Sequence, residues 1–388
     1  MKKFVELIRR MHNERYSVVL DKVVTEKIPV ALLSVAPIER ALEVIKELRE
    51  GGLIIDKLIT VSDLHTLSDD LISDLEIFRI SDIAKIHPRP EYIFTWDSHW
   101  SMPSARIAVK SAADCKVISV TGGDTDKCYD YFMEHLQEFY EVYESLIDEE
   151  SKKTFYGYWL GKVTGNFGYY HFTNGTHYLT AGFIPNRGAV AIDGGVCDGA
   201  TAVMFTELGW EVHGFELDKP NFDRTKNLAD EKGFKLINAG SGSYKHETKY
   251  LSVPGGNGGA NRVDSNGSET AKIVTLDSYV RENNLSSVDF IKLDVEGSEL
   301  DVLIGARTTI ARFKPILAIS AYHKLEDFYV IVDCIKSIRN DYEFALRHFA
   351  TDSESEPAFL PEDFSNVLTT LGLRPEIRND GECVLFAR

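Results

Sequence analysis

The amino-acid sequence predicts an α/β protein in which a Rossmann-like, doubly wound sheet follows a smaller, degenerate Rossmann-like domain. Short apolar runs alternate with amphipathic helical stretches along both halves of the 388 residues, which is typical of parallel strands covered by helices. In the second half, one apolar run leads directly into a glycine-rich turn at residues 191–201, AIDGGVCDGAT. Hydrophobic residues make up 44% of the chain, so each domain can bury a core.

Residues 1–150 predict a Rossmann-like accessory domain for dimerisation or acceptor recognition. Strands are expected at 29–36, 57–62, 91–96 and 116–121, and helices at 39–50, 104–113 and 126–146. No glycine fingerprint follows the first strand, so a complete dinucleotide site is not expected there. Asp63 and Asp97 follow the second and third strands and leave a residual ligand site open.

Residues 151–187 predict an aromatic connector between two domains. The preceding run at 148–154, DEESKKT, is polar and is expected to be a connector. Nine aromatic residues follow between Phe155 and Tyr178 without a clear period. They could pack between the domains, or they could form a lid or one wall of an acceptor pocket, because ligand pockets are often lined by aromatic side chains.

Residues 188–388 predict the main domain. Its strands are expected at 190–193, 212–216, 235–238, 288–294, 315–320, 343–349 and 382–387, and its helices at 200–208, 219–232, 298–304 and 325–339. A stretch rich in Gly, Ser and Asn at 238–275 predicts a hairpin with a flexible tip, and the polar run at 351–361 predicts a surface loop.

The glycine-rich turn predicts a nucleotide-type site. Asp193 ends a strand, Gly194 and Gly195 form the turn with Asp198 beyond them, and Gly199 opens a helix that holds Thr201. Glycines let the backbone approach a ligand, and a helix start offers unpaired N–H groups. The Asp193 carboxylate would repel a pyrophosphate but can pair with an ammonium group, which favours S-adenosylmethionine over NAD.

The next strand supplies an acidic residue at a suitable distance. It ends in Phe215-Glu216-Leu217, about 20 residues after the turn, where an acidic side chain can accept both hydroxyls of a ribose.

A second group of carboxylates follows the strand at 288–294. This strand delivers Asp294 to the sheet edge where α/β proteins bind ligands, and Glu296 lies just beyond it. Asp294 could orient a methyl acceptor or accept its proton, or it could hold a metal with Glu296, although we predict no metal ligands from two carboxylates alone. Glu299, in the first turn of the following helix, is expected to complement the helix dipole.

His323 is the histidine placed best for catalysis. It follows the strand at 315–320 and therefore lies at the same sheet edge as Asp294. A neutral imidazole in this position could act as general base for a hydroxyl, or it could simply bond to a helix start.

At these residues the chain resembles the FkbM-type methyltransferases, a class I S-adenosylmethionine-dependent family. The resemblance covers about residues 188–388 and is carried by four segments and by the Tyr322-His323 pair. The segments are AIDGG at 191–195, Phe215-Glu216, TLDS at 275–278 and FIKLDVEGSE at 290–299. One departure is the run at 194–198, GGVCD, where the family more often has G-A-N-x-G.

The resemblance implies a class I methyltransferase fold and O-methylation of a hydroxyl on a sugar or secondary-metabolite-type small molecule. It places Asp193 and Gly195 at the methionine end of the cofactor, Glu216 at the ribose, and Ala239 with its neighbours near the adenine. Two alternatives remain from the residues: an NAD-linked sugar oxidoreductase, and a non-catalytic nucleotide-binding assembly protein.

Charge and cysteine content limit the partners. Asp and Glu number 60 against 43 Lys and Arg, a net charge of −17, which argues against nucleic acid and anionic membrane surfaces. Five scattered cysteines without a CxxC pair, and the absence of a signal-like start, predict a cytoplasmic protein with reduced thiols. A small-molecule hydroxyl acceptor and a possible homodimer complete the expected partners.

Overall fold

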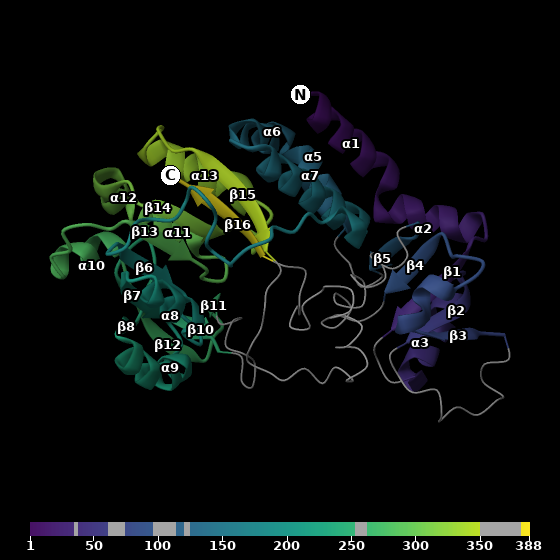
Figure 1. The fold of residues 1–388 in the computed structure, drawn as a ribbon, viewed down its shortest axis with the longest axis horizontal. Coiled ribbons are helices and arrows are strands. Elements are labelled where there is room, and N and C mark those ends of the chain that lie inside the picture. Colours follow the sequence, from purple (N-terminus) through teal and green to yellow (C-terminus); the bar gives the residue numbers. More distant parts are fainter. Residues whose placement is uncertain (35–37, 61–73, 96–113, 120–124, 253–261, 350–381) are drawn as a thin grey trace. The chain divides into compact units, whose positions relative to one another are not determined.

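The computed structural model describes residues 1–34, 38–60, 74–95, 114–119, 125–252, 262–349 and 382–388. These residues form two compact units (Figure 1). Unit 1 contains Met1–Leu136 and Lys153–Phe172, and unit 2 contains Gln137–Lys152, Thr173–Phe349 and Glu382–Arg388. Both units hold a parallel sheet with helices, so the predicted α/β class is confirmed.

The sheet of unit 1 is entirely parallel and has the order β3-β2-β1-β4-β5. Its strands are β1 (Pro29–Ser34), β2 (Ile54–Thr60), β3 (Glu76–Arg79), β4 (Tyr92–Thr95) and β5 (Lys116–Ser119). This is the order of a Rossmann-type half sheet extended by two strands. Four strands are confirmed, whereas β3 was not expected, because it is a short edge strand without a fully buried residue.

Most helices of this half are also as expected. Helix α3 (Ile38–Glu50) matches its prediction, and the helix expected at 126–146 is divided at His135 into α5 (Thr125–Glu134) and α6 (Leu136–Ser145). Two helices at the start, α1 (Lys2–Glu14) and α2 (Tyr16–Thr25), were not predicted. The helix expected at 104–113 lies outside the described residues, as do Asp63 and Asp97.

The polar connector at 148–154 contains the start of helix α7 (Glu149–Thr164), which the sequence did not predict. The Asp148 carboxylate accepts the backbone N–H of Ser151 at 2.7 Å, as a helix N-cap does. Arg347 donates to both oxygens of Asp148, at 2.7 and 3.2 Å, and holds the pKa of this carboxyl near 2 against the effect of burial. The polar run is therefore a capped helix start.

The sheet of unit 2 has the order β15-β16-β14-β13-β6-β7-β8. Its strands are β6 (Val190–Gly194), β7 (Glu211–Glu216), β8 (Lys235–Asn238), β13 (Phe290–Leu293), β14 (Ile316–Ser320), β15 (Phe344–Phe349) and β16 (Glu382–Ala387). Strand β16 runs antiparallel to both neighbours and the other pairs are parallel. All seven predicted strands are confirmed within one or two residues at most ends.

Helices and a small sheet complete unit 2. The helices include α8 (Ala200–Glu207), α9 (Lys219–Lys232), α10 (Leu276–Glu282), α11 (Glu299–Ile304), α12 (Arg307–Phe313) and α13 (Asp327–Ile338). The predicted hairpin is confirmed by antiparallel pairing of β10 (His246–Leu251) with β12 (Glu269–Val274), flanked by β9 (Gly240–Ser241) and β11 (Arg262–Val263). Its tip at 253–261 and the loop at 351–361 lie outside the described residues.

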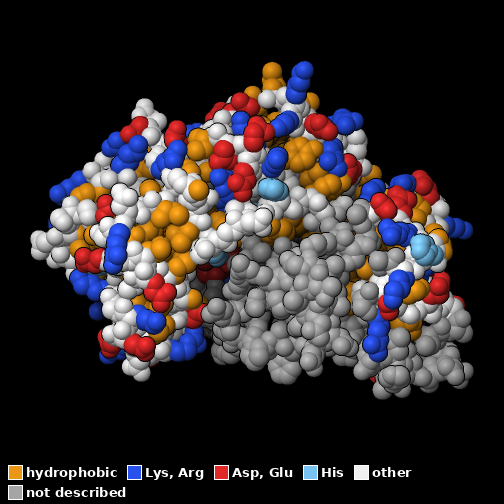
Figure 2. Space-filling view, in the orientation of Figure 1, with side chains coloured by type: hydrophobic (Ala, Val, Ile, Leu, Met, Phe, Trp, Pro, Cys, Tyr) orange, Lys and Arg blue, Asp and Glu red, His pale blue; other side chains and the backbone are white. Residues whose placement is uncertain are grey.

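The surface gives two further observations. On the face drawn in Figure 2, acidic and basic side chains are interspersed over the described residues. Among the helices of the described ranges, none is both long and apolar enough to cross a bilayer.

A buried ion pair joins the two central strands of unit 2. Lys292 on β13 is the register partner of Asp193 on β6, and its Nζ lies 3.0 Å from Asp193 Oδ1. The same Nζ donates to the carbonyls of Gly195 at 2.7 Å and Gly194 at 3.3 Å. Burial opposes the charge of Lys292, but the carboxylates of Asp193 and Asp294 raise its pKa above the usual value, so the lysine keeps its proton. Burial also raises the pKa of Asp193, and the Lys292 ammonium opposes that shift.

We predict that Lys292→Met lowers the free energy of unfolding by about 3–5 kcal/mol, because it leaves a buried carboxylate without its cation. The double variant Asp193→Asn, Lys292→Met should lose less than the single variant, since it removes both charges. Native-state hydrogen exchange of the β6 and β13 amides measures both values. A double variant as unstable as Lys292→Met would contradict this prediction, because removing the unpaired carboxylate would then restore no stability.

Candidate functional site

A cavity opens at the carboxyl ends of β6, β7 and β13 in unit 2. Its described lining includes Gly195, Glu216, Leu217, Ala239, Asp294 and Glu296. These residues come from four separate segments that the sequence analysis singled out. The parallel strands bring them to one edge, which is where open α/β sheets bind ligands.

The glycine turn is fixed by the loop that follows β13. Gly195 has φ +85°, and a Cβ added to it would lie 1.9 Å from the carbonyl oxygen of Asp294. The N–H groups of Gly195 and Val196 donate to the Phe215 carbonyl at 3.0 and 3.2 Å. Only glycine fits this position, and the turn is thereby held against both β7 and the Asp294 loop.

Other predicted turn residues lie behind or beside the cavity. Asp193 and Gly194 are buried and Asp193 faces Lys292, so its carboxylate has a resident cation in place of the expected cofactor ammonium. Gly199 is the N-cap of α8 and has φ +90°. The exposed Asp198 accepts the N–H of Ala200 at 3.0 Å, and Thr201 lies in the first turn of the helix. These three residues shape the helix start and are not part of the cavity lining.

Glu216 is held rigidly at the end of β7. Its Oε2 accepts the N–H of Cys197 at 2.8 Å and its Oε1 accepts the N–H of Asp218 at 2.7 Å. Burial raises the pKa of Glu216 to about 7 in spite of these two bonds. Each oxygen keeps a second lone pair, so the carboxylate can still accept hydroxyl groups from a ligand.

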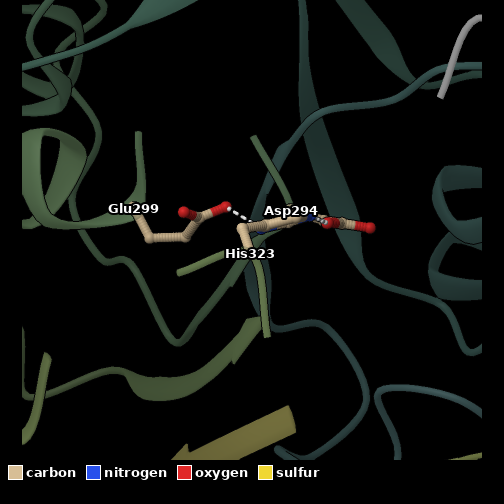
Figure 3. Close-up of side chains that lie close together, drawn as sticks. All are labelled: Asp294, Glu299 and His323. Carbon is tan, nitrogen blue, oxygen red and sulfur yellow. Dashed lines mark ion pairs between the residues drawn. The ribbon is translucent and has the colours of Figure 1, made fainter. Parts of the chain in front are cut away.

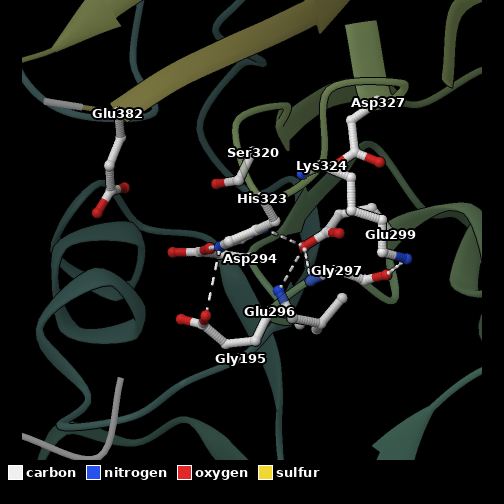
Figure 4. A network of polar contacts seen from close by, with 12 residues as sticks. Gly195, Asp294, Glu296, Gly297, Glu299, Ser320, His323, Lys324, Asp327 and Glu382 are labelled. Atoms are coloured by element: carbon white, nitrogen blue, oxygen red, sulfur yellow. Dashed lines mark hydrogen bonds and ion pairs between the residues drawn. The ribbon is translucent and has the colours of Figure 1, made fainter. Parts of the chain in front are cut away.

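His323 lies between carboxylates, two of which, Asp294 and Glu296, line the cavity (Figures 3 and 4). Its Nδ1 lies 3.0 Å from Glu299 Oε1, and its Nε2 lies 3.4 Å from Asp294 Oδ1 and 3.6 Å from Glu296 Oε2. Burial alone would lower the pKa of His323, but the three carboxylates raise it to about 9. This pKa favours the protonated ring at neutral pH, and the expected role of a neutral His323 as general base stays a prediction.

The two lining carboxylates differ in basicity. Burial raises the pKa of Glu296 to about 7. Asp294 is also desolvated, but Lys292, His323 and a hydrogen bond from Tyr178 hold its pKa below the usual value. Glu296 is thus the stronger base of the two, and near pH 7 it can both hold and release a proton.

The trio Asp294, Glu299 and His323 also has the composition of a metal site, with one potential ligand atom from each within 4.8 Å of the others. In Figure 3, however, the imidazole ring lies between the two carboxylates and turns one nitrogen toward each. Both ring nitrogens of His323 thus face carboxylates and are engaged in ion pairs, so we assign no metal to these three residues.

Sequence reasoning missed Tyr178, which comes from the aromatic stretch. Its hydroxyl donates to Asp294 Oδ2 at 2.7 Å and lies 3.3 Å from Ser320 Oγ. His177 stacks on its ring and lies 3.0 Å from Glu382 Oε2 through its Nε2. Nothing in the sequence distinguishes Tyr178 from the other eight aromatic residues of this stretch. Its role depends on the tertiary fold, which places its hydroxyl beside Ser320 of β14 and Glu382 of β16.

Known proteins resemble this chain in fold and in one family model. The FkbM methyltransferase of Methylobacillus flagellatus has a similar fold, with a TM-score of 0.61 and 18% identity over 100% of this chain and 98% of that one. A precorrin-6y C5,15-methyltransferase from Geobacter metallireducens matches 53% of this chain and 81% of its own, with 10% identity and a TM-score of 0.30. No curated protein matches the chain. Residues 193–357 match the family model of the methyltransferase FkbM domain, so the chain carries a domain of that family and is a methyltransferase.

Proposed function

We propose that the chain transfers a methyl group from S-adenosylmethionine to a hydroxyl of a small-molecule acceptor, such as a sugar. The observation that carries this proposal is one cavity lined by Glu216 from the end of β7 and by Asp294 and Glu296 from the loop after β13. The methyltransferase domain leaves the oxidoreductase and assembly-protein alternatives without support.

The residues of the cavity fit the cofactor. Glu216 is positioned by two backbone N–H groups and has lone pairs for the ribose hydroxyls. Leu217, Ala239 and Ile273 offer an apolar surface for the adenine beside it. The Asp294 carboxylate also lines the cavity and stabilises the positive charge of the methionine part of the cofactor.

The cofactor supplies an electrophilic methyl group, whose C–S bond breaks as the acceptor oxygen forms the new C–O bond. Glu296 takes the hydroxyl proton, because its carboxylate lines the cavity and its pKa lies near neutrality. Asp294 stays ionised and orients the acceptor hydroxyl, held in place by Tyr178. Most of the rate enhancement then comes from positioning the two reactants.

We also propose that this reaction takes place in the cytoplasm. The five cysteines are scattered along the sequence and include no CxxC pair, so the sequence indicates no disulfide framework. Such cysteine usage is typical of proteins kept in a reducing compartment.

Glu216→Gln should weaken the binding of S-adenosylhomocysteine about 10- to 100-fold, because a hydrogen bond to a charged acceptor contributes about 1.5–3 kcal/mol. Isothermal titration calorimetry measures this change. Glu207→Gln is the matched control, since Glu207 is an exposed glutamate on α8 whose ion pair with Lys232 lies at the surface. Unchanged affinity in Glu216→Gln would remove the ribose contact from the proposal.

Turnover should rise with pH and level off above about pH 7, because Glu296 accepts a proton only in its ionised form and burial raises its pKa to about 7. The release of S-adenosylhomocysteine with a panel of hydroxylated acceptors measures kcat/KM between pH 5.5 and 8.5. Glu296→Gln should reduce kcat by about 10²- to 10⁴-fold and abolish the rising limb.

Glu207→Gln again serves as the control and should keep both the rate and the pH profile of the native chain. A native profile that is flat over this range would point to Asp294 as the proton acceptor, since its pKa lies below the usual value. Full activity in Glu296→Gln would exclude Glu296 from that role.

A further inference from the structure

Three contacts converge on one oxygen of Glu299. Its Oε1 accepts the N–H of Val295 at 2.9 Å and the N–H of Gly297 at 3.4 Å, and it lies 3.0 Å from Nδ1 of His323. The side chain is 0% exposed, although it sits in the first turn of a helix of only six residues. Burying an ionised glutamate costs free energy unless the charge is paired or hydrogen-bonded.

A helix-dipole role does not account for these contacts. Asp301 lies in the same first turn of α11, is exposed, and accepts the hydroxyl of Ser243 at 3.0 Å. A carboxylate that only complements a helix end can stay in water, as Asp301 does. Burial and the contact with His323 are therefore specific to Glu299.

The two N–H groups belong to the residues on either side of Glu296. Glu296 has φ +53° and Gly297 has φ +91°, so the backbone turns through two left-handed residues in succession. A glutamate adopts this conformation only when its surroundings impose it. Because Glu299 binds the N–H before and the N–H after Glu296, it holds this turn and directs the Glu296 side chain to the cavity.

The third contact connects the same oxygen to the imidazole. With Nδ1 facing Glu299, the ring presents Nε2 to Asp294 and Glu296 (Figure 4). The ring is 9% exposed and cannot turn to solvent without losing this partner. One carboxylate thus fixes both the turn that carries Glu296 and the cation that faces it.

We infer that Glu299 is a positioning residue for methyl transfer, which holds the Glu296 turn and the His323 ring as one unit. This inference rests on the proposed function for the role of Glu296 as proton acceptor. Glu299 itself is buried behind the ring and has no contact with the cavity.

The test follows His323 by NMR in the full chain labelled at histidine, with the His323 signals assigned from His323→Gln. The charged groups around the ring are Asp294, Glu296 and Glu299, with Lys324 and Asp327 next to them at the start of α13. In Glu299→Gln the pKa of His323 should fall by about one unit or more, because the ring loses its nearest carboxylate.

Turnover and cofactor-product affinity together distinguish a positioning role of Glu299 from a role in fold stability alone. Glu299→Gln should lower kcat about tenfold or more while leaving the affinity for S-adenosylhomocysteine unchanged, because the Glu216 end of the cavity is untouched. Asp301→Asn is the matched control, since it removes a charge from the same helix turn, and it should change neither kcat nor the pKa of His323.

A His323 pKa and a kcat that stay native in Glu299→Gln would overturn the inference. If this variant does not fold, hydrogen exchange of the native chain decides instead: the Val295 and Gly297 amides should exchange slowly, and rapid exchange of both would refute the proposed contacts. Failure of the proposed function is distinguishable, because Glu296→Gln would then retain activity while Glu299→Gln still shifts the His323 pKa.

Discussion

The site depends on one buried cation. Lys292 pairs with the carboxylate of Asp193, is also attracted by that of Asp294 and donates to the carbonyl of Gly195. It therefore joins β6 to β13 where both strands end in loops of the cavity. Gly195 in turn packs against the carbonyl of Asp294. The loop expected to hold the cofactor and the loop that carries the acids are therefore fixed relative to each other from inside the sheet.

In this arrangement the carboxylate of Glu216 and those of Asp294 and Glu296 have different electrostatic surroundings. Near Glu216, backbone N–H groups hold the carboxylate and apolar residues surround it. Near Asp294 and Glu296, two cations, Lys292 and His323, partly neutralise the acids. The site can therefore accommodate a cationic donor and a neutral acceptor, because the proposed reaction removes one positive charge from the donor and brings one proton from the acceptor.

The sequence predicted the parts of this site that follow local rules. Apolar residues bounded by polar ones mark strands β7 and β13 in the sequence, so Glu216 and Asp294 could be placed at their carboxyl ends. The partner of Asp193 could not be predicted, because it depends on the register between β6 and β13. The protonation of His323 and the role of Tyr178 likewise depend on side chains brought together from distant segments.

The segment Gln137–Lys152 has a practical consequence for work on the isolated domain. Leu146 and Ile147 lie along β15, Ser151 Oγ accepts the N–H of Leu346 at 2.9 Å, and Asp148 neutralises the buried Arg347. A fragment that begins at the start of the matched family region would lack this segment. It would expose the edge strand β15 and leave the buried guanidinium of Arg347 without the Asp148 carboxylate. Expression of the catalytic half as a separate protein therefore calls for a fusion that brings this remote piece of chain along with it.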